Sequence, residues 1–226
     1  MRKPKKPVRT YDGSRRRQRA EQTRERILEA ARGRFAERGY AETTIEMIAA
    51  AADVALPTVY AVFRSKRGVL AALMQRLVSG EEGGPPLLET RGAQAVHAET
   101  DPRRTLERFV DHLIGVQERV IPTYEVMKSA ARSEPEVAEL LGRMQEYRFS
   151  NITSLAARLA ELGALRKALS VDDASRTIWA IASPELRQML HTFARWPPDR
   201  YRAWLLDTLV SALLEPMSTQ SKRQRR

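Results

Sequence analysis

Apolar residues recur at intervals of three and four along most of this sequence, and this period constrains the fold more than any other feature. In one example, Ile27, Ala31 and Phe35 fall on the same face of a helix. No stretch alternates apolar and polar residues in the way that a half-buried strand does. Glycine and proline interrupt the apolar period, as they do where helices begin or end. The sequence therefore predicts an all-α fold of about nine to ten helices.

Four helices are expected in the N-terminal third of the chain. The first covers about residues 21–38, and the second is about nine residues long. Residues with known capping preferences mark the ends of these helices: Gly39 after the first, Thr43 with Glu46 before the second, Pro57 in the first turn of the third, and Ser65 before the fourth.

Longer helical segments follow, and proline or glycine separates each from the next. We expect helices at about residues 103–120, 123–133, 136–163, 171–183, 185–195 and 199–214, with breaks at Pro122, Pro135, Gly163, Pro184, Pro197 and Pro198. Residues 80–102 are rich in glycine, proline and polar residues and are predicted to be a linker or mobile loop.

The positive charge of the chain is concentrated at its two ends. The whole sequence holds 39 Lys and Arg against 28 Asp and Glu, a net charge of +11, of which residues 1–19 carry +8 and residues 218–226 carry +4. Such segments bury too little apolar surface to offset the entropy of ordering, so both are predicted to be disordered. A run of this kind is either a solvated tail or an arm that binds phosphate groups.

Several classes of function find no support in the sequence. The chain has no cysteine, which excludes disulfides and thiolate sites and is consistent with a reducing, cytoplasmic setting. No apolar run is long enough to span a membrane, and we expect no membrane association. Phosphate-binding and dinucleotide motifs are absent, as are nucleophile motifs, so neither an enzyme nor a cofactor is expected. The histidines His97, His112 and His191 lie far apart in the sequence, and no metal site is predicted.

Residues 45–63 fit a helix-turn-helix. A steep crossing of two helices needs a small residue at the contact, and Ala49 is placed there. Four positions later, the turn needs a residue that tolerates positive φ, and Asp53 is one of the tolerant types. Val54 and Val59 then anchor the turn and the second helix in the core. An ordinary helical hairpin is the alternative interpretation.

The surrounding residues favour the DNA-reading interpretation, because the N-terminal third resembles the TetR (tetracycline repressor) family over about 60 residues. The resemblance rests on motifs that agree in order and spacing: Phe35-Ala-Glu-Arg-Gly39-Tyr40, Thr43-Thr44, Thr58-Val59-Tyr60-Ala61-Val62-Phe63 and Ser65-Lys66. It extends at lower specificity through Ser183-Pro184-Glu185-Leu186 and the segment from Arg200 to Leu205.

The resemblance implies that the second helix of the motif enters the DNA major groove. It implies phosphate contacts from Thr44, Tyr60 and Lys66, and base contacts from residues 56–61, that is, from Leu56, Pro57, Thr58 and Ala61 together with Tyr60. Ala55, Pro57 and Ala61 differ from the types common in the family, so capping is weakened and base reading is expected to depend on thymine methyl groups and DNA shape. Beside this motif, the basic run of Arg15, Arg16, Arg17 and Arg19 is interpreted as an arm on the phosphate backbone or in the minor groove.

The resemblance also implies that the C-terminal helices bind a small effector and form a homodimer. Dimerisation is required on physical grounds too, because one short helix buries too little for specific binding to a two-fold site. The candidate effector contacts are Phe109, His112, Tyr124, Met127, Met144, Tyr147 and Trp179, and the candidate dimer contacts are Trp179, Leu186, Leu190, Trp204, Leu205, Leu209 and Leu213. The excess positive charge of the chain lies outside these helices, so a largely apolar effector is expected.

These observations predict five segments: a basic arm (residues 1–19), a helix-turn-helix domain that includes the start of the fourth helix (20–79), a linker (80–102), an effector and dimerisation domain (103–217) and a basic tail (218–226). The predicted function is a homodimeric repressor that binds a palindromic site on double-stranded DNA and is released by an effector. An activator with the same DNA contacts remains open, as does a helical ligand-binding protein or enzyme whose helix-turn-helix is vestigial.

Overall fold

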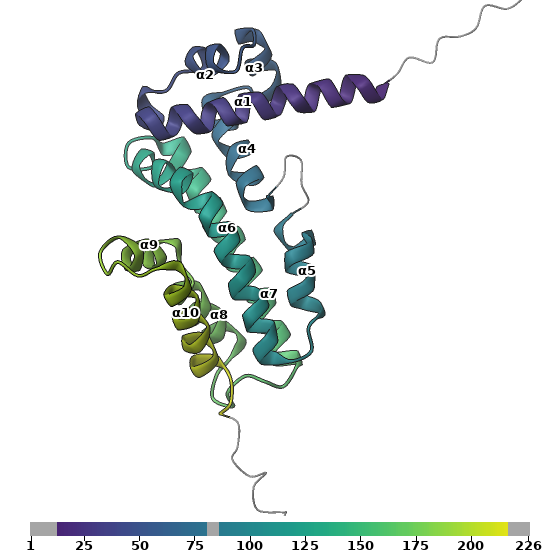
Figure 1. The fold of residues 1–226 in the computed structure, drawn as a ribbon, viewed down its shortest axis with the longest axis vertical. Helices are drawn as coiled ribbons and strands as arrows, with labels where there is room; N and C mark the ends of the chain where they lie inside the picture. The colour runs from purple at the N-terminus through teal and green to yellow at the C-terminus, as the bar shows by residue number, and fades with distance from the viewer. Residues whose placement is uncertain (1–12, 81–85, 217–226) are drawn as a thin grey trace, which may run out of the picture. The chain divides into compact units, whose positions relative to one another are not determined.

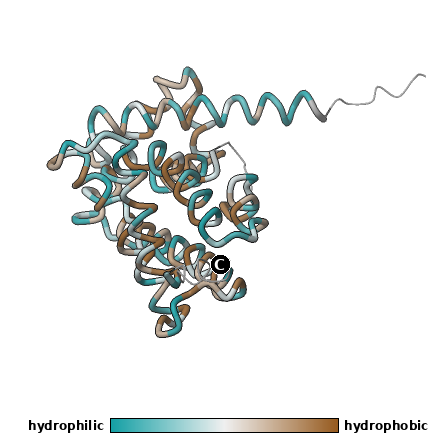
Figure 2. Tube along the Cα trace, turned by 60° about the horizontal axis from the view of Figure 1, so that its bottom comes forward, coloured by the Kyte–Doolittle hydropathy of each residue, from teal (hydrophilic) through white to brown (hydrophobic). Residues whose placement is uncertain are grey.

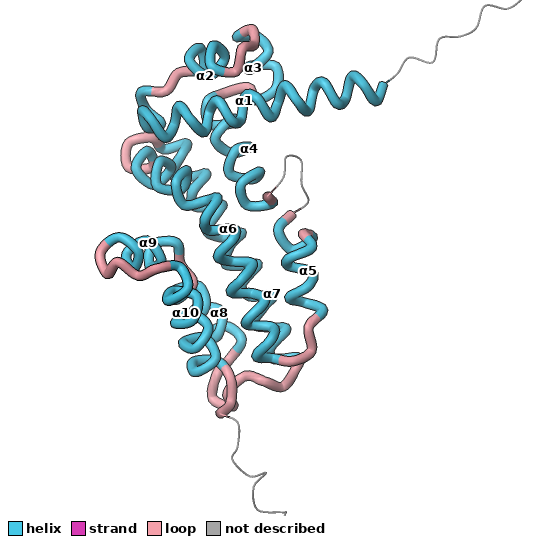
Figure 3. Tube along the Cα trace, in the orientation of Figure 1, coloured by secondary structure: helices cyan, strands magenta, loops and turns pink. Residues whose placement is uncertain are grey.

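The structure is a computed structural model that describes residues 13–80 and 86–216. Within these ranges the chain forms ten α-helices and one short 3-10 helix, with no strand (Figure 3). A single bridge between Leu165 and Leu214 is the one β-type pairing in the described residues. The prediction of an all-α fold is confirmed. No single helix in the described ranges is both long and apolar enough to cross a membrane.

The chain divides into two compact units, residues 1–73 and residues 74–226. The sequence placed this boundary after residue 79, whereas the structure places it inside α4 (Lys66–Ser79), which is one continuous helix. Each unit is described below by itself.

The N-terminal unit consists of α1 (Gly13–Glu42), α2 (Ile45–Ala51), α3 (Leu56–Phe63) and the first turns of α4 (Figure 1). One apolar face of α1 provides much of its core, through Ile27, Leu28, Ala31 and Phe35. The remaining core residues come from the shorter helices: Ile48, Ala49, Val59, Phe63, Val69 and Leu70. The four helices expected in this region are all present.

The first helix begins earlier than the sequence analysis proposed. Residues 13–19, expected to belong to a disordered arm, form the first two turns of α1, while residues 1–12 lie outside the described residues. The helix extends because the segment from Arg15 to Gln22 holds only good helix formers, with no glycine or proline to stop it. It ends where predicted, since Gly39 has a φ of 74° inside the merged helix.

The C-terminal unit is a bundle around two long helices, α6 (Pro102–Ala130) and α7 (Pro135–Glu161), which lie side by side in Figure 1. α5 (Arg91–Ala98) packs on α6, and α8 (Val171–Ile181) packs on α7. α10 (Pro198–Leu213) contacts both α6 and α8, and α9 (Pro184–Thr192) contacts α10. The bundle core is formed by the apolar faces of α6, α7, α8 and α10.

Two local predictions in this unit are wrong. Part of the expected linker is the 3-10 helix η1 (Leu87–Glu89) followed by α5, whose Ala93 and Val96 are buried; residues 81–85 lie outside the described residues.

Pro122 does not break α6, which runs through it. The loss of one backbone N–H is tolerated there because Val120, Thr123 and Tyr124 are buried on both sides of the proline and hold the helix in place. The basic tail of residues 218–226 also lies outside the described residues.

Candidate functional site

The segment from α2 to α3 has helix-turn-helix geometry. The two helices turn by 111° across a break of four residues, within the range of this motif. Asp53 has a φ of 51°, which is the positive value that the sequence analysis assigned to it. The amide of Val54 donates to the carbonyl of Ala49 at 3.1 Å, so the turn closes directly over the small residue at the helix contact.

A side chain of α1 fixes this turn from outside, and the sequence analysis missed it. The Arg26 guanidinium donates to the Ala52 carbonyl from Nε at 3.1 Å and from Nη2 at 2.6 Å, and Nη2 also donates to the carbonyl of Asp53. Hydrogen bonds from a charged donor are stronger than neutral ones. Arg26 therefore holds the turn, and with it the start of α3, at a set position relative to α1.

The cap of α2 lies one residue later than the predicted capping box. Thr43 is fully buried, and its hydroxyl donates to the carbonyls of Arg34 and Gly39, so it is not available as a cap. Thr44 is the N-cap instead, and its hydroxyl accepts a hydrogen bond from the amide of Met47 at 3.3 Å. The exposed Thr44 thus lies at a helix N-terminus, where a phosphate contact is chemically favourable.

The outward face of α3 carries the residues predicted to read DNA. Val59 and Phe63 point into the core, whereas Pro57 and Ala61 are exposed, and 44% of the Tyr60 surface is accessible. Leu56 and Thr58 are half-buried. At about 100° per residue, Pro57, Tyr60 and Ala61 share the outer face of α3, with Leu56 and Thr58 at its two edges. Their contacts with DNA remain a prediction.

Helix α3 lacks a side-chain cap. Ala55 occupies the N-cap position of α3 and makes no capping hydrogen bond, as expected for alanine. Because Ala55 is exposed with extended φ and ψ, a hydroxyl is accommodated there without strain. We expect Ala55→Ser to raise the free energy of unfolding of the N-terminal unit by about 1 kcal/mol. Urea denaturation followed by circular dichroism measures this; an unchanged or lower midpoint would contradict it.

Lys66 is held inside the N-terminal unit. Its ammonium group donates to the carbonyls of Tyr40 at 2.8 Å and Ala41 at 3.3 Å, and it lies 4.3 Å from the centre of the Tyr40 ring. The Tyr40 ring in turn stacks on Phe35, with 5.6 Å between the ring centres. These contacts of Lys66 join α4 to Tyr40 and Ala41 at the end of α1. The contact of Lys66 with a DNA phosphate remains a prediction.

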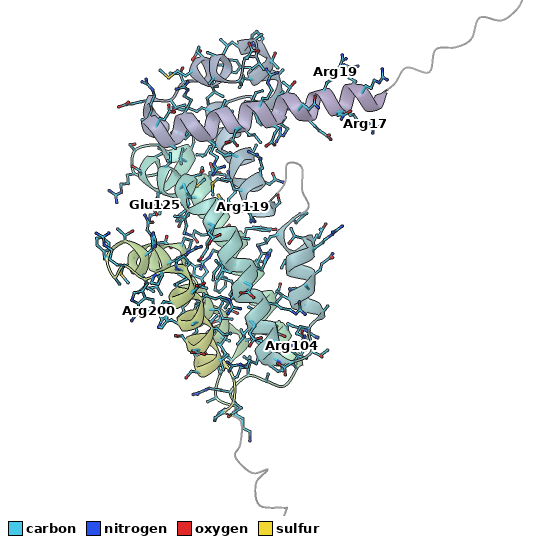
Figure 4. The ribbon with its side chains drawn as sticks, in the orientation of Figure 1. Arg17, Arg19, Arg104, Arg119, Glu125 and Arg200 are labelled. Atoms are coloured by element: carbon cyan, nitrogen blue, oxygen red, sulfur yellow. The ribbon has the colours of Figure 1, made fainter. Side chains whose placement is uncertain are left out.

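The arginines of the predicted arm are exposed on the first turns of α1: Arg15, Arg16, Arg17 and Arg19. Figure 4 shows Arg17 and Arg19 projecting from this end of the helix, and Figure 2 shows that the surrounding turns are mainly hydrophilic. A phosphate-binding role for them is supported by charge and exposure, and it remains untested.

A cavity of about 310 Å³ lies in the C-terminal unit, among α5, α6 and α7. Five of the seven predicted effector contacts line it: Phe109, His112, Tyr124, Met144 and Tyr147. The other two do not line it. Met127 is fully buried one helical turn beyond Tyr124 and does not line the cavity. Trp179 lies on the surface of α8, where its ring contacts the Arg148 guanidinium at 5.2 Å.

Polar atoms without partners are the distinctive feature of this cavity. His112 Nε2, Gln145 Oε1 and both amide atoms of Asn151 are buried and form no hydrogen bond in the structure. Burial, together with the neighbouring charge of Arg119, lowers the pKa of His112, so the imidazole is neutral at physiological pH. The sequence analysis missed Gln145 and Asn151, because a polar residue on a long helix is usually a surface residue.

Two residues of the lining, Tyr124 and Gln145, belong to a hydrogen-bonded chain. Gln145 Nε2 donates to the Tyr124 hydroxyl at 2.6 Å, and this hydroxyl donates to Glu185 Oε1 at 2.6 Å. Burial raises the pKa of Tyr124, and the Glu185 carboxylate raises it further. Tyr124 therefore stays protonated and fixes the orientation of the Gln145 amide, which leaves Oε1 as the unpaired atom.

The predicted dimer contacts separate into two groups. Leu205, Leu209 and Leu213 are fully buried in the core of their own bundle, so the prediction that they face a partner is wrong. They repeat every four residues and therefore occupy the inner face of α10. The other predicted contacts are half-buried or exposed: Leu186, Leu190, Trp204 and Trp179. The sequence analysis missed two exposed apolar residues at α9, Met189 and Phe193, the latter 82% exposed.

Comparison with known proteins gives a family match for the N-terminal unit. Residues 27–73 match the model of the family described as bacterial regulatory proteins, tetR family. Among curated proteins, none matches the sequence of this chain.

Solved structures show the same fold over most of the chain. They include NalD, the secondary repressor of the MexAB-OprM multidrug efflux pump in Pseudomonas aeruginosa, at 22% identity and a TM-score of 0.69, covering 88% of this chain and 99% of that one. A transcriptional regulator from Saccharomonospora viridis in complex with choline has 22% identity, a TM-score of 0.66, and coverage of 85% and 98%. The SmeT complex with triclosan has 24% identity, a TM-score of 0.64, and coverage of 86% and 93%.

Proposed function

Residues 27–73 of this chain belong to the tetR family of bacterial regulatory proteins, and on that premise we propose that the chain is a homodimeric repressor released from its operator by a small molecule. The observation that carries the proposal is the outer face of α3, where Thr58 and Tyr60 are presented next to a fixed turn. A short helix positioned in this way fits the DNA major groove. The exposed arginines at the start of α1 supply positive charge for the phosphate backbone.

A two-fold operator needs two copies of the chain. One short recognition helix buries too little surface for specific binding, and two of them spaced by one DNA turn, roughly 34–36 Å, read two half-sites. In the C-terminal unit, Trp179, Met189 and Phe193 expose apolar surface on α8 and at α9. Subunit contacts cover apolar surface that a single chain leaves exposed. We place the dimer contact on this surface.

The cavity supports control by an effector. Val78 of α4 lines it, and Arg119 of α6 donates from Nε to the carbonyl of Leu77 at 3.0 Å. The C-terminal turn of α4 is therefore bonded to the helices that surround the cavity, and the same helix continues into the N-terminal unit. A ligand that fits one arrangement of α4 and α6 better than another shifts the population toward it. In this proposal, that shift alters the spacing of the two recognition helices.

Footprinting on the DNA upstream of the gene tests the proposal. We expect protection of two half-sites whose centres are one helical turn apart. Tyr60→Phe removes a single hydroxyl and should weaken operator binding roughly ten-fold, the effect of one charge-assisted hydrogen bond. Thr153→Val also removes a single hydroxyl, on α7 in the C-terminal unit and outside the cavity, so it is the matched control and should bind DNA normally. Equal binding to random DNA and to the upstream region would contradict the proposal.

A further inference from the structure

The cavity in the C-terminal unit has polar groups specific enough to define a class of ligand. We propose that its ligand is an uncharged molecule with an apolar body and a head group that both donates and accepts hydrogen bonds, such as a phenol, an alcohol or a primary amide, recognised by Gln145 and Asn151 with His112. This inference rests on the proposed function, since it identifies the effector of the same regulator.

The walls of the cavity select the apolar body. Ten of the 22 lining residues are leucine, valine, isoleucine or phenylalanine, among them Phe109, Leu113 and Ile152. The volume of about 310 Å³ is at the lower end of the range for ligand pockets. A compact ligand such as a single substituted ring therefore suits it better than a large one.

The ionisable residues of the lining disfavour a charged ligand. No aspartate or glutamate is among the described lining residues, so a cation would have no carboxylate in direct contact, and the Glu185 carboxylate behind Tyr124 already accepts a hydrogen bond from the Tyr124 hydroxyl. The two lining arginines are already engaged. Arg143 forms an ion pair with Glu139. Arg148 donates from Nη2 to the Trp179 carbonyl at 2.6 Å, and the negative charge of Glu185 favours its protonated form. An anion would thus compete with existing partners, whereas a neutral ligand leaves both arginines as they are.

The unpaired atoms define the head group. Gln145 Oε1 and Asn151 Oδ1 are acceptors, so the head group must donate a hydrogen bond to at least one of them. Asn151 Nδ2 is a donor, so the head group must also accept one. A hydroxyl or a primary amide does both, a carboxylate only accepts, and a trimethylammonium group does neither. A hydrocarbon of the same shape leaves all these atoms unpaired, which is costly in a buried site.

His112 is positioned to take part from α6. A Cβ atom at Gly92 of α5 would lie 2.2 Å from His112 Nδ1, so the absence of a side chain at Gly92 allows the ring to lie against α5. The lowered pKa keeps the ring neutral, and neutral imidazole presents either a donor or an acceptor at Nε2. His112 therefore adjusts to the ligand, while the Gln145 amide is fixed by Tyr124.

A matched series of butylbenzenes tests the ligand class by isothermal titration calorimetry on the full chain. The series comprises 4-butylphenol, butylbenzene, 4-butylbenzoate and (4-butylphenyl)trimethylammonium, which differ only in the head group. We expect 4-butylphenol to bind at least roughly ten-fold more tightly than each of the other three. In Asn151→Leu the preference for the phenol over butylbenzene should fall below about three-fold. Thr153 lies on α7 outside the cavity, so Thr153→Val is the control and should keep the preference.

Tighter binding of the benzoate or the ammonium compound would overturn the inference, as would equal binding of phenol and butylbenzene. An absence of binding by all four compounds would overturn it too. Operator binding of the ligand-free Asn151→Leu protein is measured in parallel and should equal that of the unaltered chain. If the unaltered chain binds the upstream DNA but shows no preference for the phenol, the ligand class alone is refuted, whereas failure of the unaltered chain to bind the upstream DNA refutes the proposed function.

Discussion

Gly68→Ala is expected to lower the free energy of unfolding of the N-terminal unit by about 3 kcal/mol, the upper part of the range for inserting an atom into a packed site. A Cβ atom at this position would lie 2.0 Å from the carbonyl oxygen of Phe63 and 3.1 Å from the carbonyl carbon of the same residue. Both are backbone atoms, so relief requires the first turn of α4 to move away from the end of α3. The amide of Gly68 also donates to the Ser65 hydroxyl at 3.0 Å, and that hydrogen bond would be strained by the same movement.

Differential scanning calorimetry measures this effect as a fall of roughly 10 °C or more in the transition of the unit, given the usual relation between free energy and melting temperature for domains of this size. Operator binding should fall with it. Gly33→Ala is the matched control, because a Cβ at Gly33 on the exposed side of α1 meets no atom within 4 Å. Alanine favours helix over glycine by about 1 kcal/mol, so Gly33→Ala should stabilise the unit. A Gly68→Ala protein as stable as Gly33→Ala would show that the contact with Phe63 is easily relieved.

The second large effect concerns the salt dependence of DNA binding. We expect joint replacement by glutamine of the four arginines on the first turns of α1 to flatten the plot of log affinity against log salt concentration, the four being Arg15, Arg16, Arg17 and Arg19. Each phosphate contact contributes a slope of about 0.9, so the slope should decrease by up to about 3.6 for each protomer. Affinity at low salt should fall steeply, and the altered and unaltered proteins should converge at high salt.

The control removes the same charge from the C-terminal unit, by glutamine replacement of four exposed arginines there: Arg132, Arg166, Arg195 and Arg200. That protein should keep most of the slope, because a change in net charge acts more weakly at a distance than a lost phosphate contact. If both proteins lose the same slope, the first turns of α1 do not bind phosphate, and the basic end of the chain acts only through net charge.

Features set by local backbone chemistry were predictable from the sequence. Gly39 ends the body of α1, Asp53 adopts positive φ in the turn, and Ser65 caps α4 through the amide of Gly68. In each case the preference of a residue for a backbone conformation is decided within a few positions of the chain. The error at Pro122 arose where burial on both sides of the proline outweighs its effect on the helix.

Features set by the direction of a helical face were less predictable. The apolar period places Leu205, Leu209 and Leu213 on one face, but it does not tell whether that face meets the chain itself or a partner. The same limit applies to Met127, which continues the stripe of Tyr124 past the end of the cavity. Asn151 and Gln145 were missed because their polarity gives no sign of burial. The contact of Arg26 with the turn joins residues 26 positions apart, a separation that no local pattern reveals.

The contact of Arg26 with the turn also bears on how such a regulator changes its target during evolution. The recognition helix has no side-chain cap of its own, and a residue of α1 holds the turn before it. Under the proposed function, placement of α3 and choice of base are encoded by different residues, and the exposed positions among residues 56–61 can vary without loss of the docking geometry. Gene duplication followed by substitution at these positions is then a short route to a new binding site, whereas substitution of Arg26 would be harmful for any site.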